Sequence, residues 1–299
     1  MDVELLRDPA VFAGRVGTWL RGEPLSANVL AVQLAGVLDR TRTAMPDSVW
    51  ALATGPAGDV VGVAMHTDPV GVFLPRLAAD VAAALADAFA DTGRPLAGAT
   101  GEAAAVRAFA AAWQRRTGSS SRQLTVTRLH RLGALVPPTG VPGRSRRAGP
   151  ADLDLVAGWF RAFAVEADPV PPAGPAAGTT AADAVAASAA ARVGNGETHL
   201  WVVDGEPVSV ASVSPPGVGV SRVGPVFTPL PGRRHGYAAA VTAAAAGVAR
   251  GRGAADVVLY TDLANPTAAG VYRRIGFRPE LDSTRVAFEP AAPGPGAAG

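Results

Sequence analysis

The stretch Arg233-Arg234-His235-Gly236-Tyr237-Ala238 lies between an apolar segment and an alanine-rich one. Residues 223–227 are β-branched or aromatic and stop at Thr228-Pro229, which predicts a strand followed by a turn. From Tyr237 to Arg250 most residues are Ala or Val, and Gly251 then ends the pattern, which predicts a helix. The helix therefore begins inside the quoted stretch, and the fold can be read outward from this strand, turn and helix.

The beginning of this helix is a candidate anion site. The first turn of any helix has backbone N–H groups without intrahelical partners and a partial positive charge. Small residues at Gly236 and Ala238 would let an anion approach those groups, and Arg233 and Arg234 add full positive charges. We interpret the stretch as a cradle for a pyrophosphate, although a glycine-containing turn before a helix can also be a turn and nothing more.

The following 40 residues repeat the order of strand and helix. Residues 256–261 are apolar enough for a short buried strand, and Asn265-Pro266 supplies a helix N-cap followed by proline at the first helical position. The predicted helix runs to about Ile275 and ends at Gly276. Tyr272 follows Asn265 by about two helical turns, so both side chains can face the same side.

This succession of motifs resembles the GNAT superfamily of acyl-CoA-dependent N-acyltransferases. The motifs are a strand, an Arg-x-x-Gly-x-Ala helix, a strand, an Asn-x-x-Ala-x-x-x-Tyr helix and a closing Gly-Phe. The resemblance covers 223–288 well and extends from about Gly149 onward. It implies an α/β (α+β) fold in which helices flank a mixed, mostly antiparallel sheet.

The resemblance also implies roles for particular residues. In the family the loop amides hold the coenzyme A phosphates, the preceding strand pairs with the pantetheine arm, and an asparagine lies nearby. Tyr272 matches the tyrosine thought to protonate the departing thiolate, although a buried aromatic of the helix would look the same. The candidate residues for binding the cosubstrate acetyl-CoA are Val226, Phe227, Arg233, Arg234, His235, Gly236, Tyr237, Ala238 and Asn265.

The general base has a weaker signal than the acid. Many relatives place a glutamate on the strand that carries the thioester, but residues 218–227 contain no carboxylate. By their order in the chain, Asp262 and Glu166 are the acids best placed for this role. Asp262 could equally form a turn at the end of a strand, and Glu166 could be a surface charge. Water could also take the proton, in which case proximity would supply most of the acceleration.

The function implied by the resemblance is direct transfer of an acetyl group from acetyl-CoA to a primary amine of a small molecule or peptide. The chain has no cysteine, which excludes a cysteine acyl-enzyme, disulfides and thiolate zinc sites. Its 4 scattered histidines do not indicate a metal site. The alternative is a non-catalytic module that binds acyl-CoA for regulation or interaction. The presence of both Asn265 and Tyr272 favours the enzyme.

Composition narrows the remaining classes. No apolar run reaches the roughly 18 to 20 residues that a membrane span needs, and the acidic N-terminus lacks the features of a secretory signal. We therefore expect a cytoplasmic protein. All 27 basic residues are arginine, and the formal net charge is only +2. Arg144, Arg146 and Arg147 lie among prolines and glycines without interleaved aromatics, which favours a solvated linker over nucleic-acid binding.

The N-terminal half predicts the same element order as the C-terminal half. Helices are expected at 3–19 and 25–38, and then strands and helices follow to a strand near 124–132. Only Pro75 and Arg76 occupy the place of the phosphate loop, so this copy is expected to bind no coenzyme A. The expected divisions are a degenerate GNAT-like domain (1–136), a linker (137–150), a catalytic domain (151–290) and a disordered tail (291–299). Within the catalytic domain, residues 169–175 could form a substrate lid or equally a plain flexible loop.

Overall fold

The computed structural model describes residues 1–41, 48–68, 70–167 and 181–290. The chain forms two compact units. The first unit comprises Met1–Leu30, Thr43–Val126 and Asp282–Gly299, and the second comprises Ala31–Arg42 and Thr127–Leu281. Among the described residues, every helix is too short or too polar to span a bilayer.

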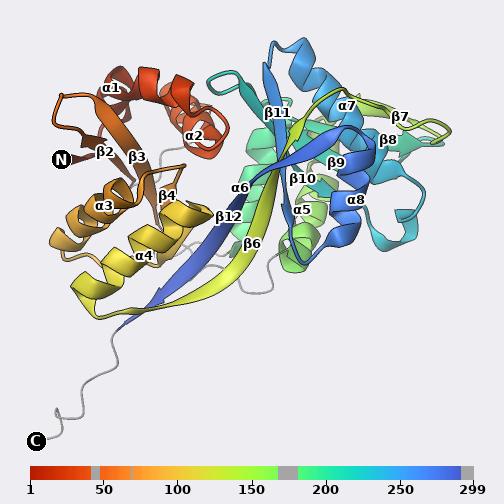
Figure 1. Ribbon diagram of the computed structural model, residues 1–299. Helices are drawn as coiled ribbons and strands as arrows, with labels where there is room; N and C mark the ends of the chain where they lie inside the picture. The colour runs from red at the N-terminus through yellow and green to blue at the C-terminus, as the bar shows by residue number, and fades with distance from the viewer. Residues whose placement is uncertain (42–47, 69, 168–180, 291–299) are drawn as a thin grey trace, which may run out of the picture. The chain divides into compact units, whose positions relative to one another are not determined.

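The first unit is a sheet covered by helices (Figure 1). Its strands β1 to β4 pair antiparallel in succession, and β4 then pairs parallel with β5. Its strands are β1 (Asp2–Leu6), β2 (Val49–Thr54), β3 (Val60–Thr67), β4 (Gly71–Leu74) and β5 (Gly98–Glu102). Its helices are α1 (Pro9–Gly22), the start of α2 (Asn28–Leu38), α3 (Ala79–Asp91) and α4 (Ala103–Thr117).

Alternation along β2 explains how this sheet buries both faces. Ala51 and Ala53 belong to the core formed with α3 and α4, which lie side by side (Figure 1). Trp50 points to the opposite face, where its ring centroid lies 5.3 Å from that of Phe12 on α1. Both Trp50 and Phe12 are fully buried. The helices therefore cover the two faces of the sheet.

The second unit repeats this arrangement. Strands β7 to β10 pair antiparallel in succession, and β10 then pairs parallel with β11. Its strands are β7 (Arg144–Arg147), β8 (Thr198–Val203), β9 (Glu206–Val213), β10 (Val220–Phe227) and β11 (Asp256–Asp262). Its helices are α5 (Leu153–Ala167), α6 (Ala181–Gly194), α7 (Tyr237–Gly251) and α8 (Pro266–Arg274), with short 3₁₀ turns at Pro150–Asp152 and Leu230–Gly232.

Two cores lie on opposite faces of the second sheet. Val210 packs in a cluster with α5 and α6, whereas its neighbour Ala211 packs in a cluster with α7. Likewise Phe227 of β10 contributes to the first cluster, and Leu259 of β11 contributes to the second. Consecutive strand residues point to opposite faces, so the sheet separates the α5–α6 layer from the α7–α8 layer.

The strand beside each parallel pair comes from the other half of the sequence. In the second unit, β11 pairs antiparallel with residues 127–131 of β6 (Ser120–Leu132). In the first unit, β5 pairs antiparallel with residues 283–287 of β12 (Phe277–Glu289). The compact units therefore differ from the consecutive segments 1–136 and 151–290 that the sequence predicts. Pairing between distant strands leaves no local signal, which explains the difference.

The predicted fold class is confirmed. The sheet pairing is mixed and mostly antiparallel, with parallel pairs at β4–β5 and β10–β11 among the described strands, and helices flank it. The candidate lid at 169–175 and the tail at 291–299 lie outside the described residues.

Two local predictions were wrong. The helix expected at 3–19 is divided into β1 and α1, because the Asp8 carboxylate caps the amides of Ala10 and Val11 and Pro9 follows it. The arginines expected in a solvated linker form β7, which pairs with β8.

Within β7, Arg146 donates to both carboxylate oxygens of Asp152 at 2.7 Å.

Candidate active site

The parallel strands β10 and β11 begin as neighbours and then part. Their register joins Val220–Arg222 to Asp256–Val258, and both strands continue beyond this pairing to Phe227 and Asp262. On its other side, the register of β10 with β9 shifts between Val223 and Val226. Main-chain groups of β10 beyond Arg222 therefore face an interrupted ladder, where an extended ligand could pair with them.

The sequence explains where the ladder stops. Pro225 has no N–H group, so it cannot donate a ladder hydrogen bond. Gly224 has φ of 145°, a conformation that glycine adopts far more readily than other residues. The pair Gly224-Pro225 thus lies at the irregular part of β10, between the paired residues before it and Val226 and Phe227 after it.

The predicted phosphate loop lies immediately before α7. Gly236 is the N-cap of α7 with φ of 84°, so the helix begins at Tyr237 as the sequence predicts. A Cβ atom at position 236 would lie 2.9 Å from Cγ2 of Val141, so the site also requires glycine for space. The His235 ring stacks on the Tyr237 ring with centroids 5.3 Å apart. The first-turn amides of α7 therefore follow directly after Gly236, and the rings of His235 and Tyr237 lie on either side of this glycine in the sequence.

Arg233 is oriented by contacts on three sides. Its Nη2 donates to both carboxylate oxygens of Glu166, at 2.7 and 2.8 Å, and its Nε donates to the carbonyl of Thr228 at 3.0 Å. The guanidinium carbon also lies 5.9 Å from the centroid of the Phe227 ring. Glu166, a candidate base, is therefore bound to the first arginine of the phosphate loop.

Tyr272 lies on α8, which Asn265 caps. The Oδ1 atom of Asn265 accepts a hydrogen bond from the amide of Ala268 at 3.0 Å. Tyr272 and Val226 both pack against the core of the α7–α8 face, and the Tyr272 ring makes an edge contact with Phe277 at 6.2 Å. Burial raises the pKa of Tyr272 to about 12. Its hydroxyl is therefore protonated at neutral pH, as a general acid must be.

Asp262 forms the turn between β11 and α8. Its Oδ1 atom accepts a hydrogen bond from the amide of Ala264 at 2.8 Å, and its carbonyl accepts from the amide of Asn265 at 3.0 Å. Such contacts are expected if Asp262 forms a turn at the end of a strand, which is the alternative to its role as a base. Both candidate bases therefore already use their carboxylates in contacts with other groups of the chain.

A pocket of about 360 Å³ opens on the α5–α6 face of the second unit. Its described lining comes from α5, α6, β10 and β11, so it includes both strands that part. The charged lining residues are Arg192 and Arg222. The lining residues are Phe160, Phe163, Ala164, Val185, Ser188, Arg192, Arg222, Val223, Gly224, Pro225 and Tyr260.

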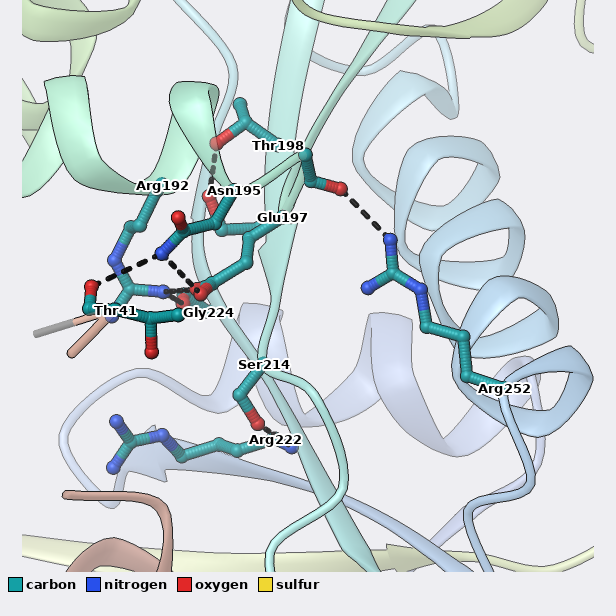
Figure 2. Close-up of polar contacts among 11 residues, drawn as sticks. Thr41, Arg192, Asn195, Glu197, Thr198, Ser214, Arg222, Gly224 and Arg252 are labelled. Atoms are coloured by element: carbon teal, nitrogen blue, oxygen red, sulfur yellow. Dashed lines mark hydrogen bonds and ion pairs between the residues drawn. The ribbon is translucent and has the colours of Figure 1, made fainter. Parts of the chain in front are cut away.

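A buried polar cluster holds one wall of this pocket. Arg192 Nη1 lies 3.3 Å from the carbonyl oxygen of Gly224 and 3.5 Å from Oε2 of Glu197, and Figure 2 shows its side chain reaching both. Asn195 Nδ2 lies 3.5 Å from the other oxygen of Glu197. Only 3% of the Glu197 side chain is exposed, so the cluster ties the end of α6 to the irregular part of β10.

Three residues at this pocket are not among those predicted from the sequence: Arg192, Glu197 and Arg222. Arg222 had a signal, because it is a charged residue within a strand of mostly apolar and small residues. Arg192 and Glu197 had no such signal. Arg192 lies in the last turn of the alanine-rich helix α6, and Glu197 immediately precedes β8. Within the described parts of the chain, no group of three or more His, Asp or Glu side chains could hold a metal ion.

Comparison with known proteins gives a family for one segment and a fold for the chain. Residues 164–277 match the model of the acetyltransferase (GNAT) family, which confirms the resemblance for this segment. None of the curated proteins compared with the chain matches it.

Solved structures are similar over nearly the whole chain. A Drosophila protein matches with a TM-score of 0.65 and 13% identity, covering 97% of this chain and 99% of its own. A GNAT-family acetyltransferase from Colwellia psychrerythraea matches with a TM-score of 0.56 and 12% identity, covering 97% and 99%. A tandem GNAT protein from the clavulanic acid biosynthesis pathway matches with a TM-score of 0.56 and 17% identity, covering 98% and 99%. At these identities the likeness shows the fold.

Proposed function

We propose that the chain, whose residues 164–277 match the model of the acetyltransferase (GNAT) family, transfers an acetyl group from acetyl-CoA to a primary amine of a small molecule or peptide. The family and the fold point to acyl transfer in general. The observation that supports the specific reaction is the parting of β10 and β11 next to the glycine-capped start of α7. The extended arm of acetyl-CoA could pair with β10 where it leaves β11, while the phosphates bind at the start of α7.

The residues of the second unit fit acetyl-CoA. The amides at Gly236, Tyr237 and Ala238 would hold the phosphates, because the helix start supplies N–H donors and a positive partial charge. Arg233, Arg234 and His235 would surround them. Glycine at 236 fits the positive φ of this position and leaves space for Val141, which a Cβ there would crowd.

The pantetheine arm would pair with the main chain at Val226 and Phe227, where β10 has left β11. Asn265 uses its Oδ1 to cap α8, and its Nδ2 would donate to the arm. These contacts lie on the same side of the unit as Tyr272, which shares its core with Val226.

Acetyl-CoA supplies a thioester carbonyl, at which a carbon–nitrogen bond forms while the carbon–sulfur bond breaks. Tyr272 gives its hydroxyl proton to the departing sulfur and recovers a proton from solvent; its raised pKa keeps this hydroxyl protonated at neutral pH before the transfer. Because Asp262 and Glu166 already serve a turn and an ion pair, we propose that water takes the amine proton.

The test is release of coenzyme A thiol from acetyl-CoA in the presence of an amine library. Tyr272→Phe should lower kcat by about 10² to 10⁴, the usual contribution of a general acid, with little change in acetyl-CoA affinity. Glu166→Gln and Asp262→Asn serve as comparison variants. Each should keep kcat within about 3-fold of the wild-type value, because removal of a general base would lower kcat far more.

The outcomes separate the alternatives. Unchanged turnover in Tyr272→Phe would remove Tyr272 from the mechanism. A large loss in Glu166→Gln or Asp262→Asn would assign the base to that carboxylate. Acetyl-CoA binding without thiol release for any amine would favour the non-catalytic binding module.

A further inference from the structure

We propose that the acceptor carries a carboxylate beside its amine, together with an apolar or aromatic group, and that Arg222 binds the carboxylate. This inference rests on the proposed function, because it names the acceptor class of that same site. Its basis is the pocket between α5, α6, β10 and β11.

The pocket lies where an acceptor would meet the acyl group. Val223, Gly224 and Pro225 line it from the irregular part of β10, and Tyr260 lines it from β11. These residues flank the place where the two strands part, just before the strand residues proposed to hold the pantetheine arm. An amine in the pocket would therefore lie close to the end of that arm.

The register of the strands places Arg222 on the pocket side. Arg222 pairs with Val258 in the parallel ladder, and Tyr260 follows Val258 by two residues. Paired residues and residues two apart share a face of a sheet, so Arg222 and Tyr260 point to the same face. Both residues line the pocket. The backbone of Arg222 is fixed by its N–H group, which donates to Oγ of Ser214 at 3.0 Å (Figure 2).

The size and walls of the pocket favour a small molecule with an apolar part. A volume of about 360 Å³ lies near the small end of the range of about 300 to 1,000 Å³ typical of small-molecule sites. Phe160, Phe163 and Val185 supply apolar wall on α5 and α6. A hydrocarbon or aromatic group of the acceptor would bury its surface against them.

The charged groups of the wall select for a carboxylate. Arg192 is bound to Glu197 and the Gly224 carbonyl, where it holds the pocket wall. Arg222 lies on the strand itself, and a guanidinium offers planar donors that match a carboxylate with two parallel hydrogen bonds. A guanidinium nearby also disfavours a charged ammonium, so it favours the neutral amine that attacks a thioester. This agrees with proton loss to water.

The test compares amines that differ only in the carboxylate. Phenylalanine is paired with phenethylamine, and leucine with isopentylamine, with acetyl-CoA as donor and thiol release as the signal. We expect kcat/KM of the wild-type protein to favour each amino acid by about 10- to 100-fold, as hydrogen bonds to a charged group would give. Arg222→Gln should bring this ratio toward one, because the amino acid loses more than its partner.

Arg161→Gln is the matched control. It removes the same charge from an exposed position on α5 that does not line the pocket, so it should keep the wild-type ratio. The ratio between variants also cancels the intrinsic reactivity of the two amines. A second measurement is the affinity of the acetylated products for the complex of the wild-type protein with coenzyme A. It does not depend on whether Arg222→Gln folds. N-Acetylphenylalanine should bind about 10-fold or more tightly than N-acetylphenethylamine.

The proposal and its premise fail in different ways. Equal kcat/KM for both members of each pair, or an equal loss for both in Arg222→Gln, would overturn the role of Arg222. Acetyl-CoA binding without acetylation of phenylalanine or leucine would overturn the acceptor class. Absence of acetyl-CoA binding would overturn the proposed function itself.

Discussion

The two units contain the same strand pattern, but their parallel pairs differ in how far the pairing extends. β4 pairs with β5 up to its last residue, where Leu74 is the partner of Gly101. β10 leaves β11 after Arg222 and continues to Phe227. One sheet is therefore continuous at the position where the other opens.

The strands of the first sheet approach one another closely at two glycines. A Cβ atom at Gly101 would overlap the carbonyl oxygen of Leu74, and one at Gly98 would overlap the carbonyl oxygen of Val286 on β12. The backbones on both sides of β5 thus approach as closely as glycine permits. In the second unit the ladder between β10 and β11 ends at Arg222, and Pro225 farther along β10 has no N–H group to donate to a neighbouring strand.

The connections after the two strands differ as well. Residues 75–78 join β4 to α3, and Ala78 is the N-cap of that helix. Residues 228–236 join β10 to α7 and include the two arginines and the N-cap Gly236. We infer that this strand pattern can bind acetyl-CoA only where the ladder opens and the following loop supplies donors. We therefore expect acetyl-CoA to bind the second unit alone.

The largest effect on this comparison should come from Gly101→Ala. Gly101 has φ of 139°, and the new Cβ would meet backbone instead of a movable side chain. Strain at such a residue costs about 1 to 3 kcal/mol, and overpacking a further 1 to 3 kcal/mol. We expect the free energy of unfolding of the first unit to fall by about 4 kcal/mol, measured by hydrogen exchange of β4 and β5 peptides.

Gly58→Ala is the control for this substitution. Gly58 also has positive φ, 83°, but a Cβ there would meet nothing within 4 Å. Its cost should be limited to the backbone term of about 1 to 2 kcal/mol. If Gly101→Ala costs no more than Gly58→Ala, close approach of the strands does not keep the first sheet closed.

A smaller effect should distinguish the units in acid. Burial, with smaller contributions from Arg252 and Arg147, lowers the pKa of His199 on β8 from 6.5 to about 4. Between pH 6.5 and pH 4 the imidazole of the unfolded chain is protonated while that of the folded chain stays neutral. The free energy of unfolding that is present above pH 6.5 therefore falls as the pH is lowered toward 4. We expect this residue to remove roughly 3 kcal/mol from the second unit over that range.

Hydrogen exchange of β8 and β9 peptides between pH 7 and pH 4.5 would measure this loss, after correction for intrinsic exchange rates. In His199→Gln the pH-dependent loss should be smaller by most of that amount, whatever the variant's stability at pH 7. An identical pH dependence in the wild-type protein and His199→Gln would show that His199 does not make the second unit sensitive to acid.

Sequence reasoning succeeded where a feature is local. The glycine start of α7, the cap at Asn265 and the helix that carries Tyr272 each depend on a few consecutive residues, and the structure has them at the expected positions. The same kind of signal, Asp8 before Pro9, was present at α1 and should have divided the helix expected there.

Features that depend on distant residues could not be predicted in this way. The pairing of β12 with β5 and of β6 with β11 joins opposite halves of the chain. The ion pair of Glu166 with Arg233 and the contact of Arg192 with Gly224 likewise join separate elements. Only Arg222, a charge within a mostly apolar strand, marked the pocket in the sequence itself.

The most direct measurement is calorimetric titration of the whole chain with acetyl-CoA, for the wild-type protein, Ala238→Glu and Ala238→Gln. A carboxylate in the first turn of α7 suits the helix dipole but would repel phosphates. We predict one site per chain, with affinity reduced by about 10-fold or more in Ala238→Glu and much less in Ala238→Gln. Two sites per chain, or one site unaffected by Ala238→Glu, would show that acetyl-CoA does not bind at the start of α7 alone.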